Sequence, residues 1–367
     1  MPILVIFIIL VVVTATIHLI SIKRNAEINE IISDLEKLKL NPEYKEAAEL
    51  NIEFFKAIRY PFLYIRWLIF RAPKIRKNRG KILELADLPL PEWQKKTHER
   101  FLKLERLFFP KIIQPIKKRV ISEIMSMQGR KKPIILLDIG CGSMELERQI
   151  IEELVKQNFT HPVIFAGVDC TSGMSDVAFK NLSSLPSSSL TEFSDVPNFR
   201  KDAFLAIMKN LVSYQGTQKF SVVFLTTNIF NLETLPENYF DLVYHSRLKH
   251  HVMPEKRGVL EKITTYLSSK VIEFDDLCII PVFIFPSIIT WRWPLTLNGA
   301  ILSYLRDPSK HELLSNNNTG WELKMDSNLG FYLRVYSKTE RNAIPLPKQR
   351  KIKKLIVSKK QLVSVKS

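Results

Sequence analysis

Runs of apolar residues alternate along the chain with stretches in which apolar residues recur every three or four positions. Residues 134–137 are all apolar, as in a strand that is buried on both faces of a sheet. A glycine-containing turn follows, and Leu146, Ile150, Ile151 and Leu154 then share one face of a helix. The pattern predicts a strand, a tight turn and a helix, which together form the first half of a nucleotide-binding βαβ unit.

Six further strands are predicted from short apolar runs, which cover residues 162–168, 220–225, 242–244, 271–274, 321–325 and 331–337. A short polar segment joins the last two runs, which is typical of a hairpin. Residues 181–200 are rich in serine, contain Pro186 and Pro197, and indicate an inserted loop. The pattern therefore predicts an α/β fold with a doubly wound, mostly parallel sheet of seven strands and a terminal antiparallel hairpin.

The first 24 residues have the pattern of a membrane anchor. Residues 3–22 carry no charged side chain, and about 20 apolar residues suffice to cross a bilayer as a helix. A cleaved signal peptide would normally have a basic segment before a shorter apolar core. Lys23 and Arg24 follow the run, which by the positive-inside rule favours a cytosolic location for the remainder of the chain. We expect a single-pass membrane protein with residues 1–24 as its uncleaved anchor.

Residues 25–130 are predicted to form a helical, membrane-proximal region. Within it, residues 54–81 combine aromatic side chains with lysine and arginine. Charges at Arg59, Arg66 and Arg71 exclude a second membrane span. Such a mixture suits the interface between lipid headgroups and acyl chains, and it equally suits an aromatic face packed on the folded domain. The sequence leaves both interpretations open.

Composition and charge narrow the class of protein. A hydrophobic content of 46% and a charged content of 25% are those of a folded protein. Three scattered cysteines argue against a disulfide framework or a zinc site and suit a reducing compartment. Much of the formal net charge of +17 lies in residues 71–81 and in a basic tail, residues 339–367. Such patches bind anionic lipid or nucleic acid, or are simply solvated surface.

Candidate site residues lie where strands end, because ligands of an open α/β sheet bind at its carboxyl edge. Asp138 closes the first apolar run, and Gly140 and Gly142 allow a ligand to approach the backbone closely. Asp169 ends the second strand, about 30 residues beyond the turn, and is placed to accept hydrogen bonds from ribose hydroxyls. The alternative is a surface aspartate that caps the next turn. His245 lies at the end of the fourth strand and is assigned to the same site.

Two segments resemble class I S-adenosylmethionine-dependent methyltransferases. Asp-Ile-Gly-Cys-Gly-Ser, residues 138–143, is similar to the family's first motif, and Met144 stands where a third glycine is usual. Leu-Pro-Glu-Asn-Tyr-Phe-Asp-Leu-Val-Tyr, residues 235–244, is similar to the stretch that leads into the family's fourth strand. The resemblance covers residues 131–338.

The resemblance implies a Rossmann-like methyltransferase fold, in which the last strand is inserted between two parallel ones. It also implies S-adenosyl-L-methionine as the cofactor. In the family, the acidic residue that ends the second strand holds the ribose, which is Asp169 here. A polar and an apolar residue after the third strand hold the adenine, and these positions correspond to Asn228 and Ile229.

The resemblance and the anchor together predict a membrane-anchored methyltransferase whose acceptor is a lipid, a small molecule or a membrane protein. The pattern names no catalytic base, although the imidazole of His245, His250 or His251 can act as one near neutral pH. No metal site is predicted, because no cysteine or carboxylate accompanies these histidines at ligand spacing. Two other hypotheses remain. One is a non-catalytic membrane scaffold, favoured by Met144 and Asn228, and the other is a membrane-tethered RNA methyltransferase, favoured by charge alone.

Overall fold

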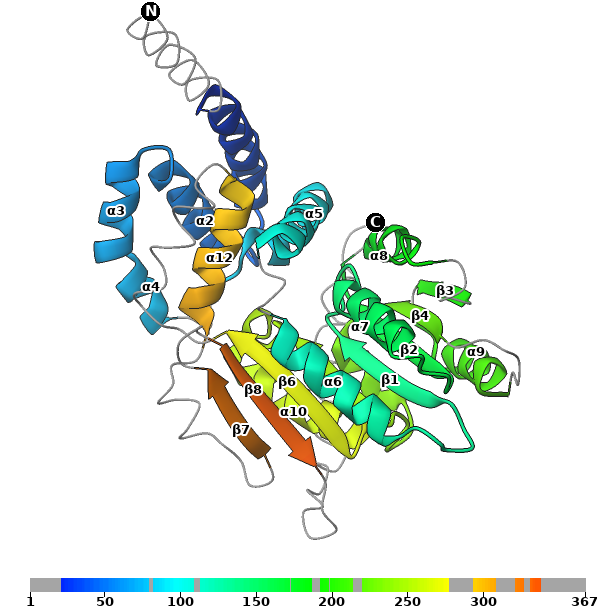
Figure 1. Ribbon diagram of the computed structural model, residues 1–367. Helices are drawn as coiled ribbons and strands as arrows, with labels where there is room; N and C mark the ends of the chain where they lie inside the picture. The colour runs from blue at the N-terminus through cyan, green and yellow to red at the C-terminus, as the bar shows by residue number, and fades with distance from the viewer. Residues whose placement is uncertain are drawn as a thin grey trace, which may run out of the picture.

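The computed structural model shows a sheet domain with a layer of helices above it (Figure 1). It describes residues 21–78, 82–108, 113–171, 173–186, 192–197, 199–213, 220–276, 293–307, 321–326 and 331–337. The predicted anchor, apart from residues 21–24, and the predicted basic tail lie outside these ranges. Within the ranges, each helix is too short or too polar to cross a bilayer.

Eight strands form one sheet in the order β3-β4-β2-β1-β5-β6-β8-β7. They are β1 (Ile134–Ile139), β2 (Val163–Asp169), β3 (Glu192–Pro197), β4 (Phe220–Thr226), β5 (Leu242–Ser246), β6 (Lys270–Asp276), β7 (Trp321–Asp326) and β8 (Phe331–Ser337). Strands β1 to β6 pair in parallel, whereas β8 pairs antiparallel with β6 on one side and β7 on the other. The last strand is thus inserted between two strands of the same direction, as expected.

β3 is an eighth strand, added to the seven that the sequence predicts. It lies in the segment whose serine and proline content indicated a loop, and it pairs in parallel with β4 at the sheet edge. Phe193 packs against one core of the sheet and Val196 belongs to the other, because side chains alternate along a strand. Pro197 is tolerated because it ends an edge strand.

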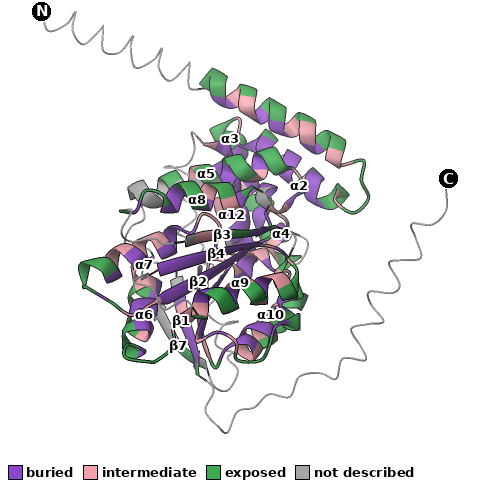
Figure 2. Cartoon of the chain, turned by 90° about the vertical axis from the view of Figure 1, so that its right-hand side faces the viewer, coloured by how far each residue is buried: buried purple, intermediate pink, exposed green. Residues whose placement is uncertain are grey.

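Helices cover both faces of the sheet (Figure 2). On one face pack α6 (Gln114–Ser126), α7 (Glu145–Lys156) and α8 (Met174–Leu182). On the other face pack α9 (Lys201–Ser213) and α10 (Pro254–Leu267). The side chains of β1, β2 and β4 are therefore buried on both faces. This is why their apolar residues run without alternation.

A separate hydrophobic core holds the helical layer together. The layer consists of the helix at residues 21–38, α2 (Lys45–Ala57), α3 (Pro61–Phe70), α4 (Ala72–Lys77), η2 (Leu85–Asp87), α5 (Pro91–Phe108) and α12 (Pro294–Arg306). Although α12 follows β6 in the chain, its leucine and isoleucine side chains belong to this core. Asn298 of α12 also donates a hydrogen bond to Asn51 of α2 at 2.9 Å. The layer lies over the carboxyl ends of the parallel strands (Figure 1).

Packing divides the chain differently from the sequence at two places. α6 packs on the sheet, although it precedes residue 131, where the methyltransferase-like segment was expected to begin. α12 completes the helical layer, although it lies within that segment. The helical layer is therefore built from two separate stretches of chain, residues 21–108 and 293–307, and the ligand edge of the sheet faces this layer.

Candidate functional site

A cleft of about 460 Å³ opens between the carboxyl edge of the sheet and the helical layer. Cavities of this size bind small molecules. The loops after β1, β2, β4 and β5 line one side of the cleft, and residues of the helical layer line the other. Six of the seven predicted site residues line it: Asp138, Gly140, Gly142, Asp169, Asn228 and Ile229.

Asp169 joins the end of β2 to the glycine turn after β1. One carboxylate oxygen accepts a hydrogen bond from Gly142 N at 3.0 Å, and the other accepts one from Thr171 N at 2.8 Å. Thr227 N donates to the backbone oxygen of Asp169 at 2.9 Å, which adds the loop after β4. Each carboxylate oxygen has two lone pairs, so each can accept a second bond from a ligand hydroxyl. Asp169 therefore shapes the turn and also offers acceptors to the cleft.

The first position of the turn is occupied by Gly140, where a side chain would be strained and would meet Leu248. Gly140 N donates to Val168 O at 2.7 Å, which pins the turn to β2. The residue has a φ of 70°, and a Cβ at this position would lie 2.7 Å from Leu248 Cδ1. Only glycine adopts this conformation readily and leaves this space.

Met144 packs beneath the glycine turn and away from the cleft. It precedes α7 with a φ of 55°, a left-handed conformation. Its side chain is fully buried in the core of the sheet and is not part of the cleft lining. A Cβ at Gly167 of β2 would lie 2.8 Å from Met144 Cε and 2.8 Å from Cys141 Sγ. The glycine in β2 thus makes room for the methionine, and the cleft stays open.

Asp138 lies in the cleft beside a second buried carboxyl group, that of Glu147 in α7. Burial, reinforced by the neighbouring Glu147, raises the pKa of Asp138 well above its usual range. Burial also raises the pKa of Glu147, whose Oε1 accepts a hydrogen bond from Tyr244 OH at 2.6 Å. The raised pKa favours the protonated form of Asp138, which can donate a hydrogen bond to Glu147 and is a poor acceptor of a substrate proton.

The loop after β4 places a polar and an apolar side chain side by side at the cleft. Asn228 immediately precedes η3 (Ile229–Thr234), and its Oδ1 accepts a hydrogen bond from Phe230 N at 3.1 Å. Asn231 Nδ2 donates to Thr227 Oγ1 at 2.9 Å, which fixes the same loop from the other end. Asn228 and Ile229 line the cleft, as the resemblance implies for the adenine-binding pair.

His245 is the one predicted site residue that the structure places outside the cleft lining. Side chains alternate along β5, so Ser246 lines the cleft while His245 is buried in the sheet domain. His245 Nε2 lies 3.9 Å from Glu273, a carboxylate that also pairs with Lys249 and Arg334. Burial lowers the pKa of His245, although the nearby carboxylates oppose this. The position of His245 therefore does not support its assignment to the cofactor site.

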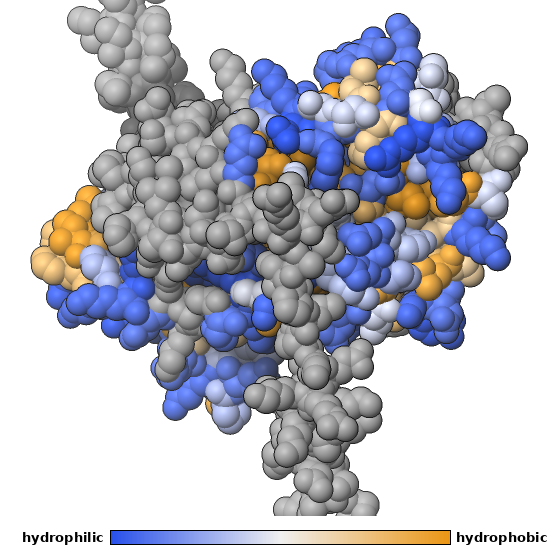
Figure 3. All heavy atoms as spheres, turned by 90° about the horizontal axis from the view of Figure 1, so that it is seen from below, coloured by the Kyte–Doolittle hydropathy of each residue, from blue (hydrophilic) through white to orange (hydrophobic). Residues whose placement is uncertain are grey.

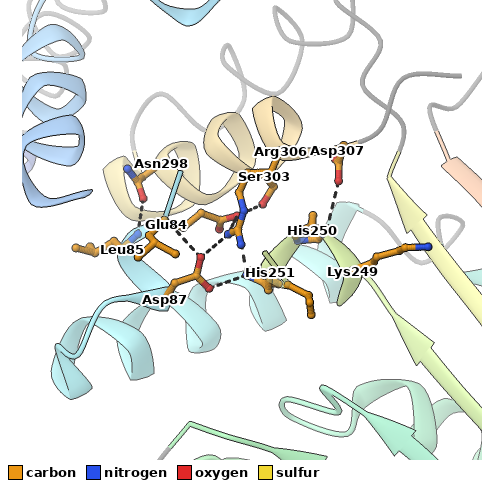
Figure 4. Close-up of polar contacts among 12 residues, drawn as sticks. Glu84, Leu85, Asp87, Lys249, His250, His251, Asn298, Ser303, Arg306 and Asp307 are labelled. Atoms are coloured by element: carbon orange, nitrogen blue, oxygen red, sulfur yellow. Dashed lines mark hydrogen bonds and ion pairs between the residues drawn. The ribbon is translucent and has the colours of Figure 1, made fainter. Parts of the chain in front are cut away.

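Four charged residues meet where the helical layer closes the cleft, and we call them the roof cluster (Figure 4). They are Glu84, Asp87, His251 and Arg306. His251 Nδ1 and Asp87 Oδ1 are 2.9 Å apart, and Arg306 forms ion pairs with both carboxylates. Ser303 Oγ donates to Glu84 Oε1 at 2.5 Å. The cluster thereby joins η2, the 3-10 helix η4 (Lys249–His251) after β5, and α12.

The charges of the roof cluster determine its chemistry. Burial alone would lower the pKa of His251, but Glu84 and Asp87 outweigh burial and raise the pKa to about 9. Burial would raise the pKa of Asp87, but Arg306 and His251 lower it below its usual range. Burial raises the pKa of Glu84. At neutral pH His251 is therefore a cation and a hydrogen-bond donor, and cannot act as a base.

His250 also lines the cleft and is paired with a buried carboxylate. Its Nδ1 lies 2.7 Å from Asp275 Oδ1 and 3.7 Å from Asp307 Oδ1. Asp275 also accepts a hydrogen bond from Lys249 N at 2.7 Å, which fixes the carboxylate at the end of β6. A histidine that a buried carboxylate holds in place has the geometry of a general base.

The sequence predicts no carboxylate near these histidines, and this prediction is wrong, because the fold brings carboxylates from distant parts of the chain beside His250 and His251. Ligand atoms lie within 4.8 Å of one another in two groups: Glu84, His250 and His251, and His250, Asp275 and Asp307. Such groups can bind a divalent cation. Arg306 and protonated His251, however, already place two positive charges beside Glu84. We therefore assign the first of these groups, Glu84, His250 and His251, to charge pairing within the protein.

Comparison with known proteins gives structural neighbours of low similarity. No family model and no curated protein matches the chain. The chain is similar to the plantazolicin methyltransferase BpumL in complex with SAH, with 13% identity, a TM-score of 0.43, and coverage of 74% of this chain and 99% of that chain.

Two further neighbours are similar at the same level. One is the methyltransferase domain of bacterial CtHen1-CN, with 12% identity, a TM-score of 0.36, and coverage of 61% of this chain and 98% of that chain. The other is the DszA carbon methyltransferase, with 10% identity, a TM-score of 0.40, and coverage of 84% of this chain and 70% of that chain. Identities and TM-scores this low carry no argument about function, which is therefore inferred below from the geometry of the chain itself.

Proposed function

We propose that this protein is an S-adenosylmethionine-dependent methyltransferase. The observation that carries the proposal is the hydrogen bond between Asp169 and Gly142, which sets a carboxylate beside a glycine turn inside the cleft. This arrangement suits a nucleoside cofactor. The carboxylate can accept hydrogen bonds from the ribose hydroxyls, and the glycine turn lets the rest of the cofactor approach the backbone closely. We assign the adenine to Asn228 and Ile229, which line the same cleft.

Two features support this cofactor over a dinucleotide and this function over a scaffold. The insertion of β8 between β6 and β7 is the sheet closure that the resemblance implies for methyltransferases. Met144, whose size favoured a scaffold, is buried under the turn and does not crowd the cleft. The remaining argument for a scaffold is Asn228 in place of an acidic residue.

The chain supplies alignment, a proton acceptor and a sheltered cleft. Bound S-adenosylmethionine brings an activated methyl group, so the protein has mainly to orient the acceptor towards it. We assign the role of base to His250, which Asp275 holds in place. His250 would take the proton from an O–H or N–H of the methyl acceptor. Asp138 is less suitable because its raised pKa favours the protonated form, and His251 is less suitable because its raised pKa favours the cation. His251 is instead placed to donate a hydrogen bond to the acceptor.

We also propose that residues 1–24 anchor the protein as a single span, with the cleft on the cytosolic side. The support is the uncharged run at residues 3–22 and the basic pair Lys23 and Arg24 behind it. A lipid or a membrane-associated small molecule is the acceptor that fits this location. An RNA acceptor is supported by the net charge of +17 alone.

Isothermal titration of the full chain in detergent micelles with S-adenosylmethionine tests the proposal. We expect saturable binding by the wild-type protein and weaker binding by Asp169→Ala. A folded wild-type protein that shows no binding would favour the scaffold hypothesis.

Transfer of a radiolabelled methyl group then identifies the class of acceptor. Membrane lipids, a small-molecule extract and total RNA are offered separately, with His250→Gln as the control for enzyme-dependent transfer. Label in the lipid or small-molecule fraction is expected. Label in RNA alone would contradict the proposed acceptor and favour the hypothesis of a membrane-tethered RNA methyltransferase.

A further inference from the structure

The segment from α2 to α4 divides its aromatic residues between core and solvent. Phe54, Phe55, Tyr64 and Trp67 are buried in the core of the helical layer. The rings of Tyr64 and Trp67 pack edge-on against Phe54, at centroid distances of 6.3 and 5.2 Å. These residues pack within the helical layer itself, whereas the second interpretation of the aromatic stretch expected them to pack on the sheet domain. Tyr64 and Trp67 are the buried residues of α3, so one side of this helix faces the core.

The other side of α3 is apolar and exposed, and we call it the α3 face. Its members have exposed fractions of 74% for Phe62, 54% for Ile65, 59% for Ile69 and 66% for Phe70. Their spacing places them on one side of the helix. Single exposed apolar residues are ordinary, but a contiguous group of four marks an interaction surface. Figure 3 shows an apolar surface at the left edge of the molecule, the side on which α3 lies in Figure 1.

Basic side chains lie on and beside the α3 face, with Arg66 between Phe62 and Phe70 on the same side of the helix. Arg66, Lys74 and Lys77 are exposed on α3 and α4, and residues 54–83 contain no acidic residue. Arg71 differs, because it forms an ion pair with Glu53 at 3.0 Å. An apolar helix face with a rim of cations complements an anionic bilayer, where the phosphates attract the cations and the apolar side chains enter the interface.

The start of α3 is fixed beside the end of the predicted anchor. Arg24 donates a hydrogen bond to Ile58 O, three residues before α3 begins. Arg59 donates to Asn29 of the same N-terminal helix at 2.5 Å. If residues 3–22 cross the membrane, Arg24 lies at its surface, and these two contacts hold the beginning of α3 there as well.

We propose that the α3 face and its basic rim are a second membrane-contact surface, which docks on an anionic bilayer beside the anchor. For its location the inference rests on the proposed anchor, and it is independent of the proposed methyl transfer. Docking would hold the helical layer against the bilayer in one orientation. The cleft beneath the layer would then keep a constant distance from the lipid surface.

The test is the lipid exposure of a fluorophore on the α3 face of the full chain. Ile69→Cys is labelled with an environment-sensitive dye in a Cys170→Ser, Cys278→Ser background and reconstituted in phosphatidylserine-rich nanodiscs that carry nitroxide acyl chains. Val259→Cys is the matched control, because Val259 is exposed and apolar and lies on α10, which packs on the sheet and not in the helical layer. We expect strong quenching and a blue shift at residue 69, and neither at residue 259.

Charge and lipid composition complete the test. Lys74→Glu with Lys77→Glu should weaken docking about fivefold for each basic residue removed, and nanodiscs of neutral lipid should reduce quenching in the same way. Equal quenching at residues 69 and 259, or quenching that is indifferent to lipid charge, would overturn the proposal. A blue shift at residue 69 without nitroxide quenching would show that a second copy of the chain covers the face. Titration of the same nanodiscs with S-adenosylmethionine reports on the cofactor site separately.

Discussion

Asp87 of η2 and His251 after β5 lie 2.9 Å apart, although 164 residues separate them in the chain. The contact joins the helical layer to the edge of the sheet beside the cleft. Arg306 of α12 pairs with the same carboxylate and so brings a third segment into the contact. The position of the helical layer over the cleft therefore depends on the charges of a few side chains.

The first prediction concerns the pH dependence of this contact. Because the pKa of His251 is raised in the folded state to about 9, its contribution to stability is complete below about pH 6.5 and is lost as the pH rises through 9. The wild-type protein should therefore lose more of its free energy of unfolding between pH 6.5 and pH 10 than His251→Gln does. Chemical unfolding of both proteins over this range measures the difference. Parallel curves for the two proteins would show that His251 is not a cation in the folded state.

The second prediction concerns the cofactor. Asp169→Ala should weaken S-adenosylmethionine binding by about 1–3 kcal/mol, because ribose hydroxyls lose a charged acceptor and the Gly142 N–H loses its partner. Isothermal titration gives the affinity. Asp202→Ala, at an exposed position of α9, is the control and should bind as the wild type does. Equal affinity of the Asp169 and Asp202 variants would remove Asp169 from the cofactor site.

The third prediction concerns the base. His250→Gln should lower kcat about 10²- to 10⁴-fold, because the acceptor loses the group that removes its proton. Affinity for S-adenosylmethionine should stay the same, since His250 is assigned to the acceptor. Steady-state kinetics and titration on one preparation separate the two effects. A variant with unchanged kcat would show that the acceptor loses its proton to water or to another residue.

The fourth prediction concerns the room that Met144 needs. Gly167→Ala should lower the free energy of unfolding by about 1–3 kcal/mol, because the added methyl group meets Met144 Cε and Cys141 Sγ at 2.8 Å. Combining it with Met144→Ala should make the two effects non-additive, as expected for residues in contact. Gly258→Ala is the matched control: no atom lies within 4 Å of the new methyl group, so this helical variant should be neutral or more stable.

The fifth prediction concerns topology. Asn158, Asn181 and Asn317 each begin a glycosylation sequon. Asn181 is buried and donates to Ser143 O at 2.9 Å, and Asn317 lies outside the described residues, so exposed Asn158 is the useful reporter. If the domain is cytosolic, expression in a eukaryotic cell should leave Asn158 without glycan. A glycosidase-sensitive mobility shift that disappears in Asn158→Gln would place the domain in the lumen.

Much of the sheet could be predicted because burial on both faces leaves a plain signal. β1, β2 and β4 are buried at nearly every position, so apolar residues occur in them without the alternation of a half-exposed strand. β3 was not predicted because it is a short edge strand in which half of the residues are polar and proline is the last. The ends of the parallel strands also indicated six residues that line the cleft. His245 does not line the cleft, because side chains alternate along β5 and Ser246 faces the cleft instead.

The roof cluster could not be predicted, because its members come from three segments that are far apart in the sequence. Glu84, Asp87, His251 and Arg306 meet only once the helical layer has docked on the sheet. One local signal existed. Glu84 and Asp87 are the first acidic residues after a basic stretch that begins at residue 54. Nothing in the sequence, however, related them to a histidine or to an arginine.

The late arrival of α12 has a consequence for biosynthesis. This helix completes a core whose other members lie between Ile28 and Trp93. About 200 residues separate Trp93 from Leu295, and a ribosome that adds 5–20 residues per second needs about 10 to 40 s to make them. During this interval the first helices are outside the ribosome without the partner that covers them. The part of the molecule that is synthesised first is therefore among the last to be completed, which leaves an unfinished apolar surface for a chaperone or a membrane to shield.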